Sequence, residues 1–203
     1  MTPEPTPAPP PSPASSSLPP LPANEAAYAD VREVIKAADT TLAGALFRIA
    51  ASYPPALRPQ GKRRARVWDV CTPEELTFLR LLGDAGQMID NAHQYVAGRL
   101  DVTYQELAEP DPTATRETLS ARLGRAIALV KEAGYLAVEA MGAAPSNEAA
   151  QAHARFAVAW TDLAFLQERA DTLEVTLVGR ETANAAALAA LDSPSAEAPA
   201  DGH

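Results

Sequence analysis

Cysteine, aromatic residues and long apolar runs are all scarce in this sequence of 203 residues. The single cysteine, Cys71, excludes an intramolecular disulfide and leaves no cysteine pair for a zinc site. Aromatic residues make up 5% of the chain, and the apolar content is mostly alanine and leucine, which favour close-packed helices over β-sheets. The longest apolar run, residues 185–191, is far shorter than the roughly 20 residues that span a bilayer. We therefore expect an all-α protein without a membrane span.

Positive charge is also in short supply. Lysine and arginine total 17 against 26 aspartate and glutamate residues, which gives a formal net charge of -9. A surface of this kind repels polyanions at long range. The N-terminus has neither the positive region nor the apolar region of a secretory signal. These absences together predict a soluble protein in the cytoplasm.

Proline is abundant but unevenly placed. Many of the 19 prolines fall in residues 1–23, where they remove backbone donors and favour the extended polyproline II conformation. We expect this segment to be a disordered tail. Its Leu-Pro-Pro-Leu-Pro stretch, residues 18–22, is a docking motif on one interpretation and a spacer on the other, and we favour the spacer. A second disordered tail is expected at residues 193–203.

Four segments with apolar residues at steps of three and four lie between the tails, separated by breaks that contain proline. They predict helices over residues 24–53, 72–109, 112–142 and 146–191. The second segment has the clearest start, with Thr72 as N-cap, Pro73 at the first helical position and Glu75 completing a capping box. Short connections after the second and third helices favour antiparallel neighbours. The prediction is a long antiparallel four-helix bundle of up-down-up-down order, packed like a coiled coil.

Several glycines interrupt the second and third predicted helices and weaken them. They are Gly83, Gly86, Gly98, Gly124 and Gly134. This cost makes sense only where another chain segment comes close. We expect Trp160, Phe156 or Phe78 to fill the space beside them.

Metal and catalytic chemistry find little support. Asp90 and His93 are spaced for one half of a di-metal carboxylate site, but His153 has no carboxylate at the matching position, because Glu148 lies five residues before it. We therefore expect His93 to be buried in the apolar seam and hydrogen-bonded. No nucleophile elbow or phosphate-binding loop occurs. We predict no catalytic residues, no metal and no cofactor, and we assign Asp171 and Glu174 to a solvated helix face.

One segment stands out by its charge, the loop between the first and second predicted helices. Its basic residues have no acidic neighbour before Asp69, and an aromatic residue follows them: Arg58, Lys62, Arg63, Arg64, Arg66 and Trp68. Such a patch suits the phosphates of a nucleic acid, an anionic lipid headgroup or an acidic partner surface. It equally suits a loop that folds back on its own acidic bundle. The sequence leaves both interpretations open.

The favoured hypothesis is a non-enzymatic structural or adaptor protein that binds itself or another protein through its fourth helix and bundle faces. The end of that helix, residues 183–191, outlasts the other helices and is apolar, so it needs a second chain to cover it. One alternative is a nucleic-acid-associated accessory factor that uses residues 58–66. A second alternative is a metal-dependent bundle enzyme.

Overall fold

The computed structural model describes residues 22–57, 69–104, 117–142 and 146–192. Four α-helices occupy most of this part: α1 (Pro22–Ala51), α2 (Pro73–Arg99), α3 (Leu119–Ala140) and α4 (Asn147–Asp192), with a short 3-10 helix, η1 (Pro55–Leu57), after α1. The described residues contain no strand. The predicted all-α four-helix bundle is confirmed. The tails were predicted at residues 1–23 and 193–203. Residues 1–21 and 193–203 lie outside the described residues, whereas residues 22 and 23 belong to α1.

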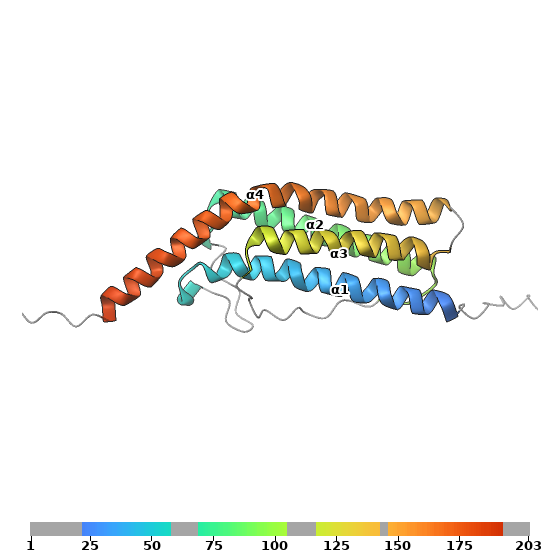
Figure 1. The fold of residues 1–203 in the computed structure, drawn as a ribbon, viewed down its shortest axis with the longest axis horizontal. Coiled ribbons are helices and arrows are strands. Elements are labelled where there is room, and N and C mark those ends of the chain that lie inside the picture. Colours follow the sequence, from blue (N-terminus) through green and yellow to red (C-terminus); the bar gives the residue numbers. More distant parts are fainter. Residues whose placement is uncertain (1–21, 58–68, 105–116, 143–145, 193–203) are drawn as a thin grey trace, which may run out of the picture.

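The helices pack side by side as a long bundle (Figure 1). α1 packs against α3, α3 against α4 and α4 against α2, while the contact between α1 and α2 is slighter. Each of these pairs is antiparallel. α2 and α3 therefore occupy opposite corners and run in the same direction, as Figure 1 shows. This order differs from the expected up-down-up-down order, in which α2 and α3 are antiparallel neighbours.

The different order follows from the length of the connection between α2 and α3. α2 ends at Arg99, where the sequence predicted residue 109, and α3 begins at Leu119, where it predicted residue 112. The longer connection allows α3 to begin at the same end of the bundle as α2 (Figure 1).

A left-handed residue ends α2. Asp101 has a φ of 55°, and the N–H of Val102 donates to the carbonyl of Ala97 at 3.1 Å, as in a Schellman motif. Val102 then packs against the core. Glycine is the usual residue at this position. Because aspartate stands in its place, the sequence does not indicate that α2 ends here.

The core is built from alanine, leucine and isoleucine, with few aromatic residues. At Gly134 a β-carbon would lie 3.2 Å from both Phe156 and Trp160, which confirms the expectation of a bulky neighbour there. At Gly124 the close group is the Gln167 side chain, not an aromatic ring. The expectation is wrong for three exposed or half-exposed positions in α2, where a β-carbon would meet nothing within 4 Å: Gly83, Gly86 and Gly98.

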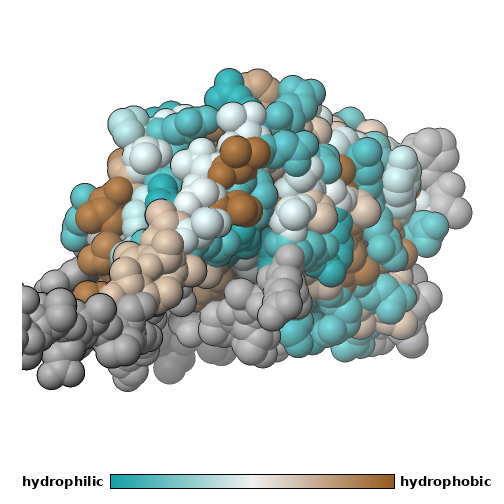
Figure 2. Space-filling view, turned by 60° about the vertical axis from the view of Figure 1, so that its left-hand side comes forward, coloured by the Kyte–Doolittle hydropathy of each residue, from teal (hydrophilic) through white to brown (hydrophobic). Residues whose placement is uncertain are grey.

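The last part of α4 is longer than the bundle. In Figure 1 its red portion leans across the end of α1 and continues past it. We call residues 185–191, which are all exposed, the α4 overhang. Figure 2 brings this end of the molecule forward, and apolar side chains gather at the lower left of that view. No helix in the described part of the chain has the length and apolarity needed to cross a membrane.

Candidate functional site

The base of the α4 overhang is fixed to the bundle by a buried ion pair. Arg180 of α4 lies with its guanidinium carbon 3.9 Å from the ring centroid of Tyr53, just after α1. Its Nη2 forms an ion pair with Oε1 of Glu75 at 2.7 Å. Tyr53 donates its hydroxyl to the other carboxylate oxygen, Oε2, at 2.5 Å. Three chain segments therefore meet at Glu75.

Glu75 also performs the local role predicted for it. Its Oε2 accepts the backbone N–H of Thr72 at 2.8 Å, and its own N–H donates to the Thr72 hydroxyl at 3.2 Å, which confirms the capping box. The side chain is completely buried. Burial alone raises the pKa of Glu75, but hydrogen bonds from Tyr53 and Thr72 and the charge of Arg180 outweigh it and lower the pKa. Glu75 is therefore a buried carboxylate held in its charged form.

A second ion pair joins the end of α1 to α4. Arg48 donates to Glu174 at 2.9 Å through Nε and at 2.5 Å through Nη2, and to Glu181 at 2.7 Å through Nη1. The other oxygen of Glu174 accepts the first backbone N–H of α3, that of Leu119, at 2.9 Å. The side chain of Glu174 is only 13% exposed. Its assignment to a solvated face is therefore wrong, because Arg48 and the start of α3 cover it. Asp171 is exposed, as predicted.

A third arginine, Arg122, is buried beside this pair. Only 4% of Arg122 is exposed, and its Nε donates to the carbonyl of Glu117 at 3.2 Å. A β-carbon at Gly44 of α1 would overlap its guanidinium group, so glycine there makes room for the charge. Burial lowers the pKa of Arg122, and the nearby Arg48 lowers it further.

The turn that follows α1 supplies the remaining anchors. Ser52 is completely buried; its hydroxyl accepts from Nη1 of Arg180 at 2.8 Å, and its carbonyl accepts from Nδ2 of Asn184 at 2.9 Å. Asn184 is the residue directly before the α4 overhang. The overhang thus leaves the bundle from a hydrogen-bonded base and not from a frayed helix end.

The chemistry of this cluster suits a structural role, the joining of chain segments, better than catalysis. The one thiol in it, Cys71, is half-buried, and burial raises its pKa, with a smaller opposing effect of the Tyr53 hydroxyl. A thiol of this kind stays protonated at neutral pH and is a weak nucleophile. Burial and the Glu75 carboxylate likewise raise the pKa of Tyr53. Neither group is activated for attack on a substrate.

His93 lies in a separate buried cluster toward the other end of the bundle. It is completely buried, and its Nε2 pairs with the Tyr28 hydroxyl at 2.8 Å, which confirms the predicted buried and hydrogen-bonded histidine. Its ring also stacks on Tyr28 and meets the edge of Tyr104. Within the described part of the chain its Nδ1 has no hydrogen-bond partner. Burial lowers the pKa of His93, Arg32 lowers it further, and Asp90 opposes both.

The metal-binding alternative gains nothing from these positions. Asp90 accepts from the Tyr104 hydroxyl at 3.3 Å. His153, which the sequence analysis excluded as a second half-site, is placed between the rings of Tyr135 and Trp160. Among the described residues no three histidine, cysteine, aspartate or glutamate side chains come together as a set that could hold a metal ion.

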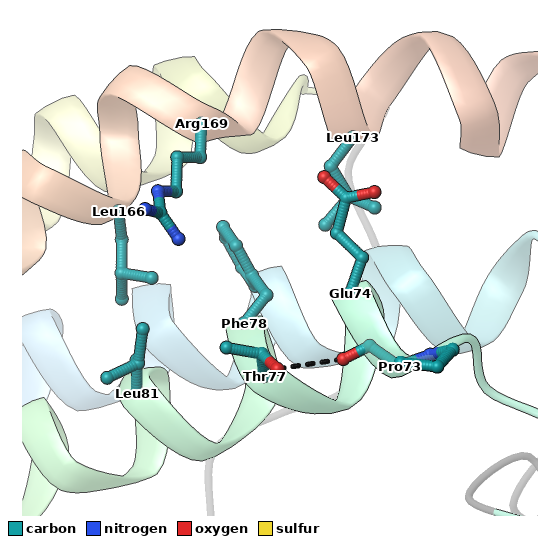
Figure 3. A pocket seen from close by; sticks show the side chains of 8 residues that line it. All are labelled: Pro73, Glu74, Thr77, Phe78, Leu81, Leu166, Arg169 and Leu173. Carbon is teal, nitrogen blue, oxygen red and sulfur yellow. Dashed lines mark hydrogen bonds between the residues drawn. The ribbon is translucent and has the colours of Figure 1, made fainter.

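A groove of about 300 Å³ runs between α2 and α4 (Figure 3). Phe78, Leu81, Leu166 and Leu173 form its apolar floor, while Glu74 and Arg169 stand on opposite helices. The Arg169 guanidinium lies 4.4 Å from the ring centroid of Phe165. No sequence pattern marked this groove, because its two walls are distant in the chain and meet only in the folded bundle.

The basic segment predicted as an anion site, residues 58–66 with Trp68, lies outside the described residues. The fold and the anchored cluster define a class: a four-helix bundle whose fourth helix is extended and fixed at its base by buried ion pairs. Comparison of the chain with protein-family models, with curated proteins and with solved structures gives no match.

Proposed function

We propose that this protein is a non-enzymatic structural or adaptor bundle that acts by protein–protein association through the α4 overhang. One observation supports this proposal above the others. The side of α4 that faces the core continues along the overhang, where the described part of the chain provides no helix to cover it.

The continuation can be followed residue by residue. Inside the bundle the core-facing positions of α4 advance in steps of three and four: Ala159, Leu163, Leu166, Ala170, Leu173 and Leu177. Further steps of the same size reach Arg180, Asn184, Leu188 and Leu191. Leu188 is 56% exposed and Leu191 82% exposed. Two leucines on a core-facing stripe are therefore left in contact with water, an arrangement typical of a surface that another chain covers.

The anchored base makes the overhang suitable for binding. Arg180 and Asn184 occupy the stripe directly before Leu188, and both are held by the turn after α1. The direction of the overhang is therefore set before a partner arrives, and less conformational entropy is lost on binding. An adaptor surface of this kind needs no catalytic group.

Crosslinking in the cell tests this proposal. A photoreactive phenylalanine analogue in place of Leu188 should give a covalent adduct with a protein on irradiation of the cells that make this protein. The matched control carries the same analogue in place of Ala186, which is two positions from both Asn184 and Leu188 and so faces away from the stripe. No adduct at either position, or equal adducts at both, would contradict the proposal.

A further inference from the structure

We infer that the α4 overhang pairs with the same segment of a second copy of this chain, and that the two overhangs run antiparallel. This inference rests on the proposed function and names the partner. It follows from three features of the overhang: its charge, its composition and its length.

The overhang carries no charge. Residues 185–191 contain only alanine and leucine, in a chain whose formal net charge is -9. Two copies of an acidic protein repel one another over most of their surface, and an uncharged segment is where they can approach without that cost. A basic protein or a nucleic acid finds no countercharge on this segment. The charge pattern thus favours a second copy over a partner of opposite charge.

The composition of the overhang matches a packing arrangement that the bundle already uses. Leucines on the α4 stripe pack against the antiparallel helix α3, whose buried face includes Ala126, Ala133 and Ala137. An overhang from a second copy offers the same mixture of leucine and alanine. Small residues let two helices approach closely, and a two-fold axis lets each copy give and receive the same contacts.

The length of the overhang sets the strength of the pairing. Seven helical residues extend about 10 Å, so the contact buries less than the roughly 1,000 Å² of a stable interface. The dimer is therefore reversible and depends on concentration. It is also small enough that a single charge placed on the stripe should abolish it.

Sedimentation equilibrium of the full chain over a concentration series tests the pairing. We expect the average mass to rise from 21.4 kDa toward twice that value. L188E and L191E should each raise the dissociation constant at least tenfold, because each places two like charges at the contact. The matched control is V175E, which adds the same charge at a site that is 75% exposed and outside the stripe. A monomer at about 1 mM chain, or an equal effect of V175E, would overturn the inference.

The direction of pairing has its own test. Spin labels at residue 178, in a C71S background, should lie roughly 30–40 Å apart in the antiparallel dimer, because each label is about ten residues, or about 15 Å along the helix, from the two-fold axis. Labels within about 15 Å of one another would show parallel helices and overturn the antiparallel arrangement. A strict monomer in solution combined with an adduct to a different protein at position 188 in cells would exclude the second copy and leave the proposed adaptor function standing.

Discussion

Arg180 stacks on Tyr53, with its guanidinium carbon 3.9 Å from the ring centroid. The two side chains meet at the same carboxylate, that of the buried Glu75. This contact joins the fourth helix to the chain just after the first and to the start of the second. It therefore fixes the end of the bundle at which α1 ends and α2 begins, and with it the direction of the overhang.

Removing the charge of Arg180 should destabilise the fold strongly. R180M keeps the aliphatic part of the side chain but leaves Glu75 as a buried, unpaired charge, and we expect a loss of about 3–5 kcal/mol in the free energy of unfolding. Urea denaturation measures this loss. The double variant E75Q/R180M should recover part of it, because both charges are then gone. If the loss in the free energy of unfolding of the double variant equals the sum of the losses of R180M and E75Q, the ion pair has no coupling energy.

Glu174 and Glu181 both contact Arg48 but should differ in their effect on stability. E174A removes a carboxylate that is 13% exposed and that also accepts the first N–H of α3, so we expect a loss of about 2–4 kcal/mol. E181A removes a carboxylate that is 40% exposed, and its loss should stay below about 1 kcal/mol. Thermal unfolding of the two variants provides the comparison. Equal losses would show that Leu119 and burial contribute nothing to the role of Glu174.

His93 should make the fold sensitive to mild acid. Its folded pKa is lowered, chiefly by burial, so the unfolded chain binds the proton more readily. The contribution of neutral His93 to the free energy of unfolding is then complete above the unfolded pKa of about 6.5. It decreases as the pH drops below that value.

Denaturation at pH 7.5 and pH 5.5 measures this dependence. H93Q should flatten the slope in that range and cost about 1–2 kcal/mol at pH 7.5, where it disturbs the contact with Tyr28. An unchanged slope in H93Q would assign the acid sensitivity to other groups.

Two glycines should respond to alanine in opposite directions. In G134A the new methyl group would press on Phe156 and Trp160, and we expect a loss of about 1–3 kcal/mol. In G83A the methyl group meets nothing within 4 Å, so the better helix propensity of alanine should add about 0.5–1 kcal/mol. Melting temperatures of the two variants should therefore move apart. A gain in both would mean that the neighbours of Gly134 yield without cost.

The sequence determined the features that depend on neighbours along the chain. Steps of three and four predicted all four helices, and α1 and α4 lie within about two residues of their predicted bounds. The capping box of Thr72 and Glu75 was readable because its two partners are three residues apart. His93 was expected in the apolar seam from its position on the α2 stripe, and it is buried there.

Only the tertiary structure decided the features that join distant segments. Arg48 meets Glu174, and Arg180 meets Glu75, across gaps that no local pattern spans. Glu174 has the sequence surroundings of a solvated carboxylate and becomes buried only because α1 and α3 cover it. The order of the helices likewise depended on where α2 ends. Periodicity reports which side of a helix is apolar, because that side recurs with each turn, but it carries no information about which helix will cover it.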